Sequence, residues 1–221
     1  MVYSILHSIF KIIARVYIRL QTIGIENIPR HGGVILAPNH PSDSDSFILG
    51  IAIRRQLHTM AKEEIFRRPL PAFIVTKLNA FPVKRGQLDR QSIRAATGIL
   101  KNGHVIDMYP EGTVSKNGDL QLPKLGTAFI ALQAKVPVVP TVIRGTQNVM
   151  LKGQRIPRPR KVVIEFGKPL YFDEYYDKPY SKKILKAVTE QIMTEIKKLL
   201  NSNVSEETYH AHIRKHEKDY C

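Results

Sequence analysis

The sequence predicts an α/β fold in which a largely parallel central sheet is flanked by helices. Short apolar runs typical of buried strands alternate along the chain with segments whose apolar residues recur at helical spacing. Such alternation is typical of βαβ units, whose strands lie parallel in one sheet. The chain has 221 residues, 43% of them hydrophobic, which is enough for one domain with its own core.

The expected strands are the short apolar runs, and the expected helices are the longer periodic segments. Strands are predicted in 34–39, the first part of 57–66, 79–86, 104–110, 136–145 and 161–170. Helices are predicted in 1–20, 44–53, the second part of 57–66, 90–103, 124–135 and 181–200. Asn102-Gly103 is a signal for a helix end. A loop rich in turn residues is expected at 111–119.

The first segment, 1–20, combines apolar residues with a basic stripe at every fourth position: His7, Lys11, Arg15 and Arg19. A spanning helix needs about 20 nearly uninterrupted apolar residues. A secretory signal has its charge before the apolar stretch and a small-residue cleavage site after it, and neither is present. We therefore expect an amphipathic helix at a membrane surface. A helix packed on the domain's own core is the alternative.

Two further regions complete the expected organisation. Residues 21–203 are predicted to form the main domain, and 204–221 a charged C-terminal tail. The tail contains His210, His212 and His216, but a solvated segment is favoured over a metal site, and no metal is expected. Cys221 is the single cysteine, so the fold needs no internal disulfide.

The charge of the chain indicates anionic partners. The formal net charge is +15 and the calculated pI is about 9.9, which suits nucleic acid, anionic lipid or phosphorylated substrates. No zinc-finger, RRM or bZIP pattern is present. There is no Trp, and the Phe and Tyr residues are scattered, so aromatic stacking platforms for single strands are not expected. Lipid or a phosphorylated substrate is favoured over nucleic acid.

Polar residues with catalytic potential follow the first buried strand. His40 precedes Asp43 and Asp45, and a histidine with a carboxylate on one ring nitrogen is a poised base. Pro41 is expected at the first helical position, with His40 as the N-cap. Because His40 would then lie outside the helix, the spacing leaves either aspartate as its partner. A helix start with solvated aspartates is the alternative.

Four segments that follow one another along the chain favour the catalytic interpretation of His40 over a plain helix start. They are Asn39-His40-x4-Asp45, "FPVKRG" at 81–86, "YPEGT" at 109–113 and "VPVVP" at 136–140. Together they resemble the four blocks of the 1-acyl-sn-glycerol-3-phosphate acyltransferase family of glycerolipid acyltransferases. The resemblance covers roughly residues 34–146.

The resemblance implies a role for one or more residues of each block. His40 would be the general base and Asp45 its partner, Arg85 would bind the substrate phosphate, and Pro140 would lie near the acyl region. Glu111 and Gly112 of the third block would be associated with the glycerol-phosphate part of the acceptor, and Thr113 is a further substrate-binding candidate there, with closure of the turn as its alternative role.

One position departs from the family pattern. The third block commonly continues to arginine, and Val114 stands there instead. Lys84, Lys116 and Lys124 are candidates to supply the missing cation. The departure affects the predicted identity of the acceptor's headgroup more than the predicted acyl-transfer reaction.

The residue inventory fits direct transfer to a hydroxyl. No serine stands in a G-x-S-x-G elbow, and the one cysteine is terminal, so no nucleophile for an acyl-enzyme is evident. The expected reaction moves an acyl group from acyl-CoA or acyl-carrier protein, as co-substrate, to the sn-2 hydroxyl of lysophosphatidate, and needs no further cofactor.

The alternatives are another lysophospholipid or glycerol-3-phosphate as acceptor. A basic nucleic-acid binder is less favoured, and no nucleic-acid partner is expected. The expected location is the cytoplasmic face of an anionic membrane.

Overall fold

The computed structural model describes residues 16–67, 72, 75–76, 79–83, 90–115, 119–149 and 158–202. Seven strands form one sheet in the order β1-β7-β6-β2-β5-β3-β4. Every strand pair is parallel except β6 with β7. The predicted α/β fold with a largely parallel sheet is confirmed.

The strands and helices follow the alternation expected from the sequence. The strands are β1 Leu20–Ile23, β2 Val34–Pro38, β3 Leu57–Lys62, β4 Ala80–Val83, β5 Val105–Asp107, β6 Val138–Arg144 and β7 Val162–Phe166. The helices are α2 Asp45–Ala52, α3 Glu63–Phe66, α5 Arg90–Lys101, α6 Gly126–Ala134 and α7 Lys182–Asn201. Short 3-10 turns occupy Ile25–Asn27, Thr146–Asn148 and Asp173–Tyr175.

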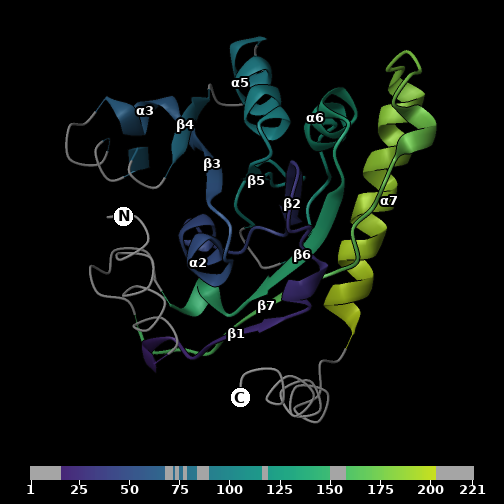
Figure 1. Ribbon diagram of the computed structural model, residues 1–221. Coiled ribbons are helices and arrows are strands. Elements are labelled where there is room, and N and C mark those ends of the chain that lie inside the picture. The colour runs from purple at the N-terminus through teal and green to yellow at the C-terminus, as the bar shows by residue number, and fades with distance from the viewer. Residues whose placement is uncertain are drawn as a thin grey trace.

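Helices cover both faces of the sheet, and each face has its own core (Figure 1). Successive residues of β2 alternate between the two: Val34 and Leu36 pack on the side of α2, whereas Ile35 and Ala37 pack on the side of α5, α6 and α7. The strand is buried throughout. A strand covered on both faces reads as a continuous apolar run, which is why this strand is evident in the sequence.

Helix α7 packs through the face that its sequence predicts. Val188, Ile192 and Ile196 are buried in the core, and Ile184 packs against it. Ser181 caps the helix, since its side chain accepts a hydrogen bond from the Ile184 amide at 3.3 Å.

The antiparallel β6–β7 pair was not expected. Its ladder begins at Thr141, opposite Phe166, directly after Pro140. Proline has no amide proton to donate, so Pro140 contributes its carbonyl alone and accepts from the Gly167 amide at 2.8 Å. On the other side Pro140 pairs with Ala37 of β2.

The N-terminal segment differs from its prediction at one end. The expected helix reaches residue 20, but Leu20 begins β1 and Arg19 before it has a positive φ of 44°. The sequence does not mark this change because Ile18 and Leu20 continue the apolar pattern of the helix, and both are buried. Residues 1–15 and the tail 204–221 lie outside the described residues. Within the described part of the chain, no helix has the length and hydropathy needed to span a bilayer.

Candidate active site

The site lies at the carboxyl end of β2, where ligands bind in open parallel sheets. Asn39, the residue after β2, is buried and makes two hydrogen bonds to the backbone of Ile143 in β6. Its Nδ2 donates to the Ile143 carbonyl at 3.1 Å, and its Oδ1 accepts from the Ile143 amide at 2.7 Å. Asn39 therefore fixes the chain to the neighbouring strand immediately before His40.

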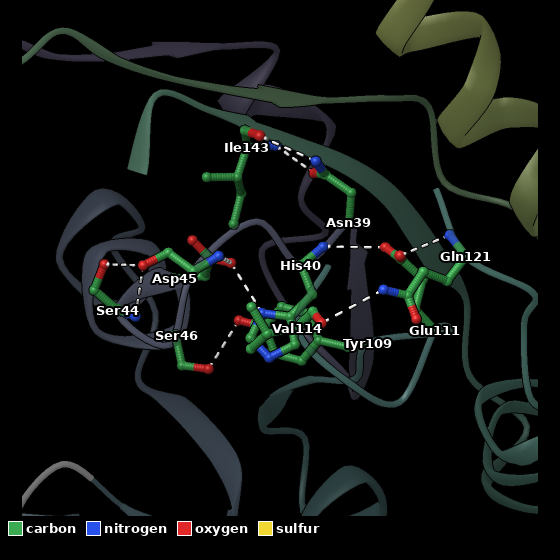
Figure 2. Close-up of polar contacts among 11 residues, drawn as sticks. Asn39, His40, Ser44, Asp45, Ser46, Tyr109, Glu111, Val114, Gln121 and Ile143 are labelled. Atoms are coloured by element: carbon green, nitrogen blue, oxygen red, sulfur yellow. Dashed lines mark hydrogen bonds and ion pairs between the residues drawn. The ribbon is translucent and has the colours of Figure 1, made fainter. Parts of the chain in front are cut away.

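His40 and Asp45 form a direct contact (Figure 2). The distance from His40 Nδ1 to Asp45 Oδ2 is 2.9 Å, and the exposed fractions of the two side chains are 15% and 0%. A carboxylate can only accept, so Nδ1 carries the proton and Nε2 is left with its lone pair. The buried negative charge also stabilises the imidazolium. The arrangement suits proton abstraction by Nε2.

The expectation that Pro41 starts the helix is wrong. Helix α2 begins at Asp45, with Ser44 as N-cap. The intervening turn is closed by Asp45 itself: its amide donates to the Ser42 carbonyl at 3.2 Å, and its Oδ2 accepts from the Ser42 amide at 2.8 Å. This local side-chain to backbone bond outweighs the preference of proline for a first helical turn. Asp43 is left exposed in the turn.

Glu111 is buried and uses both carboxylate oxygens on backbone amides. Oε1 accepts from the His40 amide at 3.1 Å, and Oε2 accepts from the Gln121 amide at 2.8 Å (Figure 2). The side chain therefore joins the segment after β2 to the loop before α6. Contact with the acceptor's glycerol-phosphate part, which the resemblance implies, stays a prediction.

The turn after Glu111 brings a cation close to the backbone. Gly112 has a φ of +68°, and a Cβ there would lie 2.8 Å from Cδ of Lys124. The Lys124 amide also donates to the Pro110 carbonyl at 2.8 Å. Glycine is favoured at this position because of the left-handed conformation, and any Cβ there would also displace the flexible end of the Lys124 side chain. Thr113, next in the turn, is exposed.

Two residues near His40 were missed by sequence reasoning. Tyr109 stacks on the His40 ring, with the ring centroids 3.8 Å apart and an interplanar angle of 22°. Its hydroxyl lies 2.8 Å from Ser46 Oγ. Asp107, the last residue of β5, is buried. The signal in the sequence was a carboxylate within the apolar run "VIDMY".

Burial dominates the electrostatics of both residues. It raises the pKa of Asp107, although the hydroxyls of Ser46, Thr59 and Tyr109 lie close enough to oppose the shift. Neither Asp107 oxygen has a well-formed hydrogen bond to the described residues. Burial, followed by the charges of Asp107 and Asp45, holds the pKa of Tyr109 well above its usual value. Tyr109 is therefore a neutral phenol at physiological pH.

The remaining predicted residues are Lys84, Arg85, Lys116 and Pro140. Lys84, Arg85 and Lys116 lie outside the described residues. Pro140 is buried within β6. The described residues contain no group of three or more His, Cys, Asp or Glu side chains suited to hold a metal ion.

Comparison with known protein families identifies the class of protein to which this sheet and this site belong. The acyltransferase family model matches residues 19–144. The chain belongs to the acyltransferase family.

Relatives and a solved structure narrow the comparison. The 1-acyl-sn-glycerol-3-phosphate acyltransferase of Bacillus subtilis is 33% identical over 177 residues, covering 80% of this chain and 85% of the relative. The enzyme of that name from Borreliella burgdorferi is 27% identical, and the match covers 61% of this chain and 55% of the relative. The crystal structure of the 1-acyl-sn-glycerophosphate (LPA) acyltransferase PlsC from Thermotoga maritima gives a TM-score of 0.70 at 26% identity. The match covers 92% of this chain and 82% of that chain.

Proposed function

We propose that this acyltransferase moves a fatty acyl group from an acyl thioester to the sn-2 hydroxyl of 1-acyl-sn-glycerol-3-phosphate, giving phosphatidate. The observation that carries the proposal is the 2.9 Å contact between His40 Nδ1 and the buried Asp45 carboxylate, which leaves Nε2 to act as a base. The names of the relatives support the acceptor.

In the proposed reaction His40 Nε2 takes the proton of the sn-2 hydroxyl as its oxygen attacks the thioester carbonyl. A C–O bond forms and the C–S bond breaks, and the imidazolium returns its proton to the departing thiolate. Asp45 stabilises the imidazolium between these two transfers. The donor is acyl-CoA or acyl-carrier protein as co-substrate, and the reaction needs no other cofactor.

Cations would bind the acceptor phosphate. Arg85 is proposed to hold it bidentately. Lys124 supports this site because its stem packs on Gly112 at the turn next to Glu111. Lys84 and Thr113 are further candidates, the turn at Glu111 and Gly112 is proposed to lie against the glycerol-phosphate part of the acceptor, and Pro140 is assigned to the acyl region. Since Val114 replaces the arginine common in the family, glycerol-3-phosphate and other lysophospholipids remain to be compared as acceptors.

The enzyme is proposed to work at the cytoplasmic surface of an anionic membrane. The proposed organisation has three parts: a membrane-associating segment that ends before β1, an acyltransferase domain that begins with β1 at Leu20 and extends to residue 203, and a charged tail 204–221. The net charge of +15 supports binding to anionic lipid, and the lack of a zinc-finger, RRM or bZIP pattern in the sequence disfavours nucleic acid. Deleting residues 1–19 should weaken sedimentation with anionic vesicles. Full retention of binding would instead favour a segment packed on the domain.

The proposal is tested by acyl transfer with purified protein in detergent. Lysophosphatidate is supplied with each of acyl-CoA and acyl-acyl-carrier protein, and glycerol-3-phosphate and other lysophospholipids serve as alternative acceptors. Phosphatidate is expected from the wild type but not from His40→Ala. His31→Ala, which alters an exposed histidine, is the matched control and should stay active. Turnover by His40→Ala at the wild-type rate would remove His40 from the role of base.

A further inference from the structure

Tyr109 packs on the face of the His40 imidazole, and Asp45 contacts the edge of the same ring. The ring centroids of His40 and Tyr109 lie 3.8 Å apart, at an interplanar angle of 22° (Figure 2). Tyr109 follows β5 by two residues and belongs to a different part of the chain from His40. An imidazole hydrogen-bonded only through Nδ1 can still swing about that bond, and a stacked ring prevents this.

The Tyr109 ring is itself anchored to the helix that carries Asp45. Its hydroxyl lies 2.8 Å from Oγ of Ser46, which directly follows Asp45 in the first turn of α2. The first turn of α2 therefore positions both groups that contact the imidazole: it carries the Asp45 carboxylate, and through Ser46 it contacts the Tyr109 ring. The backbone of His40 is held by a third residue, because its amide donates to Glu111 Oε1.

Three carboxyl groups lie around this stack. Asp45 from α2 contacts His40 Nδ1, Asp107 from β5 lies close to Tyr109, and Glu111 from the following loop accepts from the His40 backbone amide. Lys124 lies at the neighbouring turn, against Gly112. Since Tyr109 stays un-ionised, it presents a neutral π-face, which attracts a cation stacked on it.

We propose that Tyr109 is a positioning residue for His40: its ring fixes the imidazole plane and stabilises the imidazolium that forms during acyl transfer. The kinetic part of this proposal rests on the proposed function. The stacking part does not, because the protonation of His40 can be measured without turnover.

The test compares Tyr109→Leu, which removes the π-face, with Tyr109→Phe, which keeps it. Each protein is labelled at histidine nitrogens and titrated by NMR in detergent, and kcat/KM is measured over the same pH range. In Tyr109→Leu the pH midpoint of the His40 titration should fall by about one unit, and kcat by about five- to thirtyfold. The acidic limb of the kcat/KM profile should move to lower pH with it. Tyr109→Phe should restore the midpoint.

A further pair of variants tests the anchor to α2. Ser46→Ala should lower kcat by less than Tyr109→Leu. Its effect should be smaller in Tyr109→Phe than in the wild type, since the phenol hydroxyl that Ser46 contacts is then already gone and only the proximity of Ser46 to Asp107 is left. Additive losses would overturn the anchoring step.

The outcomes separate the two hypotheses. An unchanged His40 midpoint in a folded Tyr109→Leu protein, or a loss in Tyr109→Phe equal to that in Tyr109→Leu, would overturn the proposal. Absence of turnover in the wild type, together with a His40 midpoint that still responds to Tyr109→Leu, would count against the proposed function and support the stack. Thermal melts identify any variant that fails to fold.

Discussion

Glu111→Gln distinguishes a residue that holds the backbone from one that binds substrate. The carboxylate accepts from the His40 amide at 3.1 Å and from the Gln121 amide at 2.8 Å, and the side chain is buried. Glutamine has the same shape but one acceptor oxygen. Its NH2 group must face one of the two amide donors, so one bond is lost and the other becomes neutral.

The size of the effect follows from these two bonds. A hydrogen bond to a charged group contributes about 1.5–3 kcal/mol, a neutral one about 0.5–1.5, and a buried donor without a partner costs about 1–3. Glu111→Gln should therefore lower the free energy of unfolding by about 2–4 kcal/mol. At about 2–4 °C per kcal/mol for a chain of this size, Tm falls by about 5–15 °C.

Kinetics should follow the backbone rather than the substrate. If the His40 amide shifts by a fraction of an ångström, kcat should fall by about ten- to a hundredfold, with KM for lysophosphatidate changed less than about twofold. Calorimetry and steady-state assays check this, with Glu190→Gln, an exposed residue of α7, as the matched control. An unchanged Tm with a large rise in KM would refute the reasoning and make Glu111 a substrate ligand.

Three further predictions concern charges. Asp45→Asn should lower kcat by about 10³–10⁴-fold, whereas Asp43→Asn, at an exposed position, should leave it near wild type; the reverse order would mean that His40 has the other partner. Burial raises the pKa of Asp107, so the folded protein loses stability as pH rises from about 4 towards that pKa. Asp107→Asn should thus raise Tm at neutral pH, and this gain should vanish in melts below about pH 4; a gain that persists in acid would contradict this. Arg85→Ala should raise KM for lysophosphatidate about tenfold or more with little change in kcat; an unchanged KM would remove it from the phosphate site.

The fold was readable from sequence where burial leaves a continuous pattern. Strand β2 is buried at every residue, and its apolar run predicts it directly. Strand β1 has four residues and depends on pairing with the distant β7. Such a short segment carries no periodicity of its own, so its assignment needs tertiary structure. The antiparallel pairing of β7 with β6 likewise depends on tertiary structure and not on a local pattern.

The site was readable only in part, for a related reason. The sequence places His40 beside two aspartates but leaves the partner open, because the choice depends on a turn that Asp45 closes through the Ser42 amide. Tyr109 reads as part of an apolar strand, and its contact with His40 joins segments 69 positions apart. Contacts of that kind arise from the sheet order, which brings β2 and β5 together.

The pairing of β1 with β7 has a consequence for biosynthesis. Within the described sheet β1 is an edge strand whose neighbour is β7, so that the first strand of this sheet in chain order lies beside its last. The sheet therefore cannot close on the ribosome until Phe166 has emerged. Throughout that interval β1 lacks its strand partner in the described sheet, so its backbone hydrogen-bonding groups stay unpaired and open to other chains until β7 has emerged.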